Sequence, residues 1–200
     1  FAVMLVVGLV TGQLTAGLRF QASVATHREV RSRALFEAAR DLSNILTQDQ
    51  AIDAAVSVIG REFRAGVAVF ALDMNDRLQP PRAGGAGLDL GTAQWALDHQ
   101  QAAGLGTDTL AGSAWLYLPL KATMRARGVL AVQPREPRLL LVPEQRLQLE
   151  TFAALTGMAL ERAHYIEVAQ TATVQMESER LRNSLLAALS HDLRTPLAAM

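Results

Sequence analysis

The chain has 200 residues, 50% of them hydrophobic and 19% charged, so it can bury a core of ordinary size and is not intrinsically disordered. Its formal net charge is zero, and this balance gives no indication of a nucleic-acid partner. Because cysteine is absent, disulfides, thiolate metal sites and a thioether-linked bilin are excluded.

The first 18 residues carry no charge. As a helix they extend over roughly 27 Å, close to the ~30 Å hydrocarbon core of a bilayer. We therefore predict the end of a transmembrane helix in residues 1–18, with a buried helix of a soluble protein as the alternative.

A basic segment follows. Residues 19–40 contain five arginines and two glutamates, which leaves a net charge of +3. The positive-inside rule then predicts that residues from about 19 onward lie in the cytoplasm, below a bacterial inner membrane. The arginines act either as a topology anchor or as contacts with anionic headgroups. Apolar residues at three- and four-residue spacing predict a helix over 27–46, and we interpret 19–46 as an Arg-rich juxtamembrane signalling helix.

Residues 47–163 combine helical and extended patterns. We predict two helices (50–63 and 91–100), three strands (66–72, 114–121 and 128–133), a loop at 80–87, a turn-rich segment at 104–113 and a long helix that begins near Pro143. This order indicates an α+β unit, an antiparallel sheet with packed helices, as in the GAF and PAS classes of sensory domains.

The unit lacks the usual signatures of an enzyme. It has no Ser/His/Asp set, no Walker-type phosphate loop and no HExxH pair, so no cofactor-binding or metal-ligating residue is assigned. We interpret His99 as a C-terminal helix cap and His164 as a surface residue on a charged helix. Trp95 and Trp115 are read as core residues, with stacking on a ligand as the alternative, and a domain without any ligand stays possible.

From Pro143 onward only Gly157 and Pro196 interrupt a helical pattern. Residues 164–183 are charged, with sparse apolar positions such as Ile166, Val174 and Leu181. Because a long solvent-exposed helix is rarely stable without a partner, we interpret 164–183 as a linker helix in a parallel, coiled-coil-like homodimer.

Residues 184–200 read SLLAALSHDLRTPLAAM. On a helix, the large apolar residues form one stripe suited to the core of a four-helix bundle: Leu186, Leu189, Leu193, Leu197 and Met200. His191 lies about 160° from the centre of that stripe, on a face of small residues. We therefore predict an exposed imidazole over which another domain can dock.

The neighbours of His191 suit phosphoryl transfer. A neutral imidazole is a good nucleophile near pH 7, since its unperturbed pKa is about 6.5. Asp192 is placed to hold the other ring nitrogen and accept its proton, and Thr195 to position a water for hydrolysis. Pro196 removes one helical hydrogen bond and predicts a bend just beyond His191. The string Ser-His-Asp-Leu-Arg-Thr-Pro-Leu resembles the H-box of histidine kinases at every position.

Four further stretches extend the resemblance to most of the chain: LTAGLRFQA (14–22), residues 98–110, LPLK (118–121) and PEQRLQLETFAALTGMALERA (143–163). Together with the H-box they resemble the KdpD potassium-sensor kinases. The resemblance implies a GAF-like sensory domain, ATP and Mg²⁺ bound outside residues 1–200, and transfer to a KdpE-like response regulator that controls potassium uptake.

The leading hypothesis is therefore an ATP-dependent protein-histidine kinase of a two-component system, present here as a fragment that is inactive alone. Residues 184–200 are its first dimerisation and phosphoacceptor segment, with His191, Asp192 and Thr195 as catalytic residues. The alternative is a non-catalytic, membrane-tethered GAF module for sensing and dimerisation that binds a small ligand or ion. A GAF-containing phosphodiesterase or transcriptional regulator is a third reading, which the H-box disfavours.

Overall fold

The structure, a computed structural model, describes residues 32–82, 85–138 and 142–197, with side chains as far as residue 186. It divides into two units, Phe1–Asn44 and Ile45–Met200. In the first unit the described part contains a helix over 32–43, inside the segment predicted to be helical. The predicted transmembrane segment 1–18 and three of the five arginines lie outside the described residues. Within the part that is described, no helix is both long and apolar enough to cross a bilayer.

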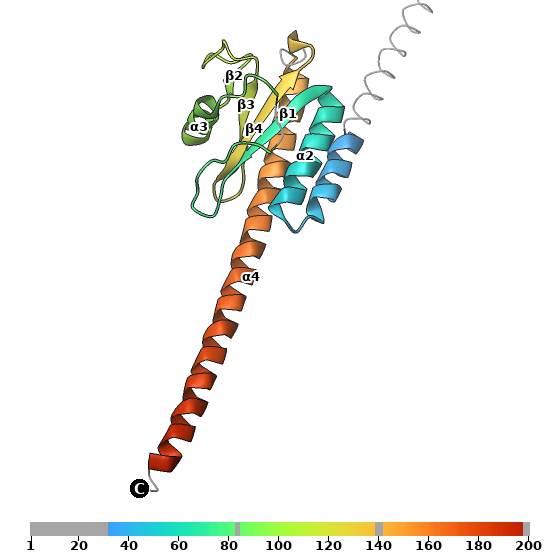
Figure 1. The fold of residues 1–200 in the computed structure, drawn as a ribbon. Coiled ribbons are helices and arrows are strands. Elements are labelled where there is room, and N and C mark those ends of the chain that lie inside the picture. Colours follow the sequence, from blue (N-terminus) through green and yellow to red (C-terminus); the bar gives the residue numbers. More distant parts are fainter. Residues whose placement is uncertain (1–31, 83–84, 139–141, 198–200) are drawn as a thin grey trace, which may run out of the picture. The chain divides into compact units, whose positions relative to one another are not determined.

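The second unit is built on an antiparallel sheet. Its four strands among the described residues follow the order β1–β4–β3–β2 (Figure 1). They are β1 (Ala65–Ala71), β2 (Ala103–Gly104), β3 (Leu116–Lys121) and β4 (Ala126–Pro134). The central strand β4 sets Val132 opposite Val67 of β1 and Leu130 opposite Leu118 of β3. The predicted antiparallel sheet is thus confirmed.

Helices cover both faces of this sheet. Helices α2 (Gln48–Phe63) and α4 (Pro143–Leu197) lie against one face, and α3 (Leu90–His99) lies on the other (Figure 1). Because successive side chains of a strand point to opposite faces, Phe70 packs toward α3 whereas Val69 points to the α2 and α4 side. Both faces of β1 and β4 are therefore apolar, and their sequences read as continuous hydrophobic runs.

Helix α2 is defined by its caps and by one buried stripe. The Thr47 hydroxyl accepts a hydrogen bond from the Gln50 amide (3.4 Å), and Arg64 ends the helix in the left-handed region. The residues that it buries recur at four-residue spacing: Ala51, Ala55, Ile59 and Phe63. Phe63 meets Phe152 of α4 edge-on, with ring centroids 5.9 Å apart, so the two helices share one core.

Helix α4 continues through Gly157, which the sequence suggested as an interruption. A Cβ at Gly157 would lie 2.6 Å from the Lys121 carbonyl oxygen and 2.7 Å from that of Leu120. Glycine therefore lets the helix backbone approach the end of β3 closely, and no helix break follows. This contact fixes α4 against the sheet one turn before it leaves the domain.

The space between α3 and the sheet is filled by the protein's own side chains. Trp115 and Tyr117 are 1% and 0% exposed, and both pack with Phe70 in one core cluster. Their polar atoms are satisfied, because the Trp115 indole donates to the Ala86 carbonyl (3.1 Å) and the Tyr117 hydroxyl accepts from the Asp89 amide (2.9 Å). The interpretation of Trp115 as a core residue is confirmed.

Candidate functional site

All three predicted catalytic residues lie in α4. His191, Asp192 and Thr195 belong to the helix Pro143–Leu197, which runs without a break from the sheet to the end of the described chain. Their side chains lie outside the described residues, so their exposure and mutual geometry stay predictions, as does the bend at Pro196. The backbone shows that one continuous helix extends from the sheet to residues 184–197.

Helix α4 projects beyond the sheet (Figure 1), and the apolar side chains of its projecting part are exposed. From Tyr165 to Leu186 every side chain is exposed except Ile166, which is half-buried. Large apolar residues in this segment are between 40% and 67% exposed: Tyr165, Val168, Val174, Met176, Leu181, Leu185 and Leu186. Such a helix needs a second surface to cover its apolar face.

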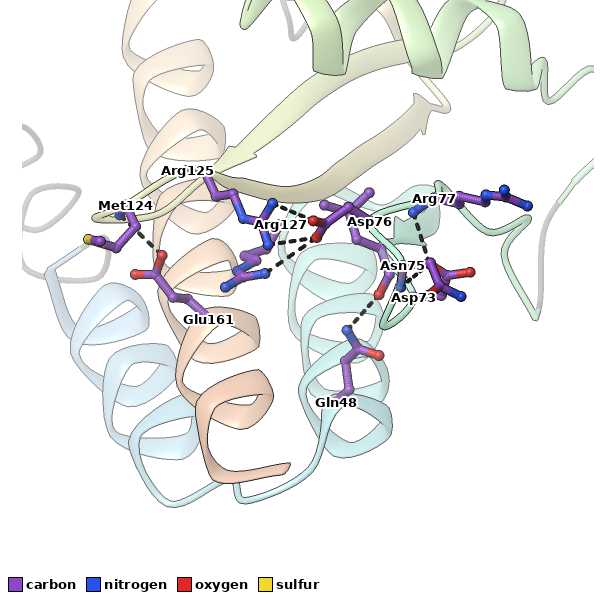
Figure 2. A network of polar contacts seen from close by, with 10 residues as sticks. Gln48, Asp73, Asn75, Asp76, Arg77, Met124, Arg125, Arg127 and Glu161 are labelled. Atoms are coloured by element: carbon purple, nitrogen blue, oxygen red, sulfur yellow. Dashed lines mark hydrogen bonds and ion pairs between the residues drawn. The ribbon is translucent and has the colours of Figure 1, made fainter. Parts of the chain in front are cut away.

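A polar cluster lies where α4 leaves the sheet, at the hairpin that joins β3 to β4 (Figure 2). The Glu161 side chain on α4 is 7% exposed. Its two carboxylate oxygens accept hydrogen bonds from the backbone amides of Thr123 (3.0 Å) and Met124 (3.1 Å). One carboxylate thus holds the tip of the hairpin against α4, with charge-assisted bonds.

Two arginines of the same cluster converge on Asp76, in the loop after β1 (Figure 2). Arg125 binds its carboxylate with both terminal nitrogens, at 2.7 and 2.6 Å. Arg127 lies 4.0 Å away, with its side chain only 4% exposed and its buried Nε without a hydrogen-bond partner. The hydrogen bond from Arg125 is the main cause that lowers the pKa of Asp76, so this carboxylate is ionised at neutral pH.

The loop that carries Asp76 is itself held in shape by Asp73. The Asp73 carboxylate accepts from the amides of Asn75 (2.8 Å) and Arg77 (2.9 Å), and from the Gln79 side chain (2.9 Å). These bonds lower the pKa of Asp73, and the Arg77 amide contributes most. Gln48 of α2 donates to the Leu72 carbonyl (3.1 Å), so the loop is anchored at its start as well.

His164 belongs to this cluster and is half-buried, which differs from the surface position expected for it. Burial lowers its pKa, and Arg127 and Arg125 lower it further by repelling an imidazolium. The next residue, Tyr165, presents its ring to the Arg127 guanidinium at 5.5 Å. Two consecutive residues of α4 therefore face the arginines of β4 and its hairpin.

The other histidine of the domain has a local role. His99 ends α3, is exposed, and its Nδ1 lies 3.0 Å from the Trp95 carbonyl oxygen. Its ring stacks on that of Trp95, with centroids 4.1 Å apart. This agrees with the interpretation of His99 as a helix cap. Trp95 is half-buried against the core cluster rather than fully enclosed.

The cluster of Asp76, Arg125, Arg127 and Glu161 was not predicted from the sequence. One signal was present, since Arg127 is a charged residue next to the apolar run that forms β4. The pairing itself was not visible, because Asp76 and Arg125 are 49 residues apart in the chain, and Met124 and Glu161 are 37 apart. Only the pairing of the strands and the packing of α4 on the sheet bring them together.

Comparison with known proteins agrees with this fold. The sequence pattern of the GAF domain family matches residues 47–162. A crystal structure of a GAF domain from an Acinetobacter phosphoenolpyruvate-protein phosphotransferase has a TM-score of 0.54 at 16% identity, and covers 68% of this chain and 95% of that one, which shows the shared fold alone. The chain therefore belongs to the GAF domain family.

The similarity is more specific for one group of sensors. The crystal structure of the native GAF domain of the potassium sensor histidine kinase KdpD from Escherichia coli has a TM-score of 0.64 at 34% identity, and covers 70% of this chain and 99% of that one. The chain is 44% identical over its full length to the sensor protein KdpD of Escherichia coli K12, and 26% identical to that of Clostridium acetobutylicum. It spans 23% of the length of each relative. The resemblance to KdpD sensor proteins is thereby confirmed.

Proposed function

We propose that this chain is the sensory and phosphoacceptor segment of an ATP-dependent protein-histidine kinase of a two-component system. The observation that carries the proposal is the continuous helix α4, which joins a GAF fold of the KdpD kind to the H-box around His191. The full-length similarity to two KdpD sensor proteins supports it. The regulated process in this proposal is potassium uptake.

The chemistry assigns one task to each predicted site residue. ATP, with Mg²⁺, supplies a γ-phosphoryl group from a domain outside these 200 residues. The His191 imidazole is the nucleophile, because a neutral ring nitrogen has a free lone pair near pH 7. Asp192 holds the second ring nitrogen and takes up its proton, and Thr195 orients water when the phosphoryl group is hydrolysed.

The partners follow from the same proposal. A KdpE-like response regulator receives the phosphoryl group on an aspartate. A second copy of the chain covers the exposed apolar residues of α4 beyond Tyr165, because these have no partner within the described residues of their own unit. The protein is placed at the bacterial inner membrane, with the GAF domain in the cytoplasm.

The GAF domain is proposed to transmit a signal mechanically. The filled space between α3 and the sheet supports this, because a ligand there would have to displace Trp115 and Tyr117 from positions at most 1% exposed. Displacing two buried aromatic side chains costs several kcal/mol of the binding free energy.

Labelling with radioactive ATP tests the proposal. We expect the chain, mixed with a separate catalytic ATP-binding domain of a relative, to gain a label that acid removes and base does not. The His191→Gln variant should gain none, whereas His99→Gln should be labelled like the wild type. A label that persists in His191→Gln would refute the assignment.

A further inference from the structure

An apolar stripe on α4 continues the stripe predicted for the helix bundle. Tyr165, Val168, Ala172 and Met176 follow each other at three- and four-residue spacing, and the same spacing leads through Glu179 and Asn183 to Leu186. Tyr165 and Leu186 are 21 residues apart, which is three heptads. We call Tyr165, Val168, Ala172 and Met176 the upper seam.

The upper seam lies on the opposite side of α4 from the residues that face the start of α2. Ala163, Glu167 and Gln170 line a cavity together with residues at the start of α2. On a helix these three positions lie roughly opposite Tyr165 and Val168. Tyr165 lies under Arg127 of its own chain, whereas Val168 and Met176 beyond it are 40% and 59% exposed. Their contact with a second copy of the chain depends on how α4 is rotated about its axis.

The polar cluster acts on α4 at the start of this seam. Glu161 lies one turn before Tyr165 and holds the hairpin tip through two amides. The Arg127 guanidinium lies over the Tyr165 ring at 5.5 Å, and Asp76 holds Arg125 and Arg127 from the opposite loop. The hairpin and β4 thus contact α4 at Glu161 and Tyr165, which lie one turn apart on one side of the helix.

We infer that the Asp76, Arg125, Arg127 and Glu161 cluster is a latch that sets the rotation of α4, and with it the seam presented to the second copy. This inference rests on the proposed kinase dimer and names the element that regulates it. A rotation of α4 imposed at Tyr165 is carried along a continuous helix to His191.

The latch is built to have two states. The guanidinium of Arg127 is buried with one nitrogen unpartnered and its nearest carboxylate at 4.0 Å, so the closed arrangement is not fully satisfied. The loop of Asp76 and the hairpin tip are both exposed at the surface, where Met74 is 52% and Met124 74% exposed. A displacement of either loop removes the counter-charge of Arg127 and releases Tyr165.

Cysteine cross-linking tests the rotation, and the chain has no cysteine of its own. Single cysteines replace Val168, in the upper seam, or Gln170, on the domain-facing side. In the wild-type background we expect Val168→Cys to form the intermolecular disulfide at least about threefold faster than Gln170→Cys, because proximity and access set the rate. Adding Asp76→Asn or Glu161→Gln should bring the two rates close together.

Asp49→Asn is the matched control. Asp49 is an exposed aspartate paired to Arg82 at 2.8 Å, and this pair does not involve the latch. The ratio of the two rates should stay at its wild-type value in this background. Three results would each overturn the inference. The ratio of the two rates could stay unchanged in Asp76→Asn and Glu161→Gln, or it could fall equally in Asp49→Asn. Cross-linking at position 168 could also be no faster than at position 170 in the wild-type background.

The failure of the inference can be told apart from that of the proposed function. If His191 is labelled but the cross-linking ratio does not change with the latch substitutions, the kinase assignment is supported and the latch is refuted. If the latch substitutions bring the two cross-linking rates together but His191→Gln is still labelled, the latch is supported as a feature of the dimer and the phosphoacceptor assignment is refuted.

Discussion

Single residues decide how α4 meets the domain. Gly157 is the position where the helix backbone touches the end of β3, and Glu161 is the position where its side chain holds the hairpin. Four residues separate them, so they lie on the same face of the helix. Both contacts precede the exposed part of α4, so this turn is where the helix is last held by the domain.

Replacing Gly157 by alanine tests that close approach. The new Cβ would lie 2.6 Å from a backbone oxygen, so we expect Gly157→Ala to lower the free energy of unfolding by about 1–3 kcal/mol. Gly60→Ala in α2 is the control, because its Cβ meets its nearest atom at an ordinary 3.5 Å and should gain about 0.5–1 kcal/mol. Urea unfolding of both variants measures the difference, and equal stabilities would contradict the packing described for α4.

His164 gives a prediction about pH. Its pKa is lowered by burial and by Arg127 and Arg125, against the opposite effect of Asp76 and Glu167. Below its usual pKa of about 6.5 the unfolded chain therefore binds more protons at this position than the folded chain, and stability falls as the pH falls. We expect the urea midpoint to drop less between pH 7 and pH 5.5 in His164→Gln than in the wild type. Parallel changes in the two proteins would count against a neutral, buried His164.

At the scale of elements, the apolar patterns predicted most of the fold. Four elements were predicted to within two residues of their ends, because long apolar runs and four-residue apolar stripes are rarely compatible with another secondary structure. They are the strands at 66–72 and 128–133 and the helices at 50–63 and 91–100. The third strand was placed two residues early, since Trp115 is buried just before β3 begins. Strand β2 was missed because two residues carry no periodicity.

The polar contacts between elements could not be predicted in the same way. Glu161 and Asp76 are unremarkable in the sequence. The pairing of β1 with β4 brings Asp76 to Arg125, and the packing of α4 on the sheet brings Glu161 to the hairpin. The bulge between Pro119 and Lys121 shifts the register of β3 against β4 near the hairpin, and no residue pattern in the sequence predicted this bulge. For the site, the chemistry at His191 stays a prediction from the sequence, and the contacts between α4 and the hairpin were not predicted.

The start of α3 offers a test at the same scale. The Asp89 carboxylate caps the helix by accepting from the amides of Gly91 and Thr92 and from the Thr92 hydroxyl. We expect Asp89→Ala to lower stability at pH 7 by about 0.5–2 kcal/mol and Asp89→Asn to lower it less. The bond to the Thr92 hydroxyl is the main cause that lowers the pKa of Asp89, so its charged contribution is present above about pH 3.9 and is lost as the pH falls further.

Thermal unfolding at several pH values measures this contribution. The stability difference between wild type and Asp89→Asn should narrow as the pH falls from 5 toward 3. A difference that stays constant over this range would show that the charge of Asp89 does not stabilise α3.

At the scale of the whole molecule, the fold joins an enclosed sensory core to an exposed helix. The core on the α3 side is filled by aromatic residues, and the opposite face is occupied by α2 and α4. Under the proposed function, a signal therefore acts by moving loops and helices against each other. The inferred latch and the continuous helix α4 offer a route from the sheet to residues 184–197, and the proposed phosphoacceptor role of His191 does not depend on the latch.

The most direct test of the central claim locates the phosphoryl group. The chain is incubated in membrane vesicles with ATP, Mg²⁺ and a separate catalytic ATP-binding domain of a relative. It is then cleaved after arginine at neutral or alkaline pH and analysed by fragment mass spectrometry. We predict that the phosphoryl group lies on His191, within the peptide of residues 183–194. A phosphoryl group on Ser184, Ser190 or His164 would contradict the account. So would a phosphorylated protein in which this peptide carries no phosphoryl group.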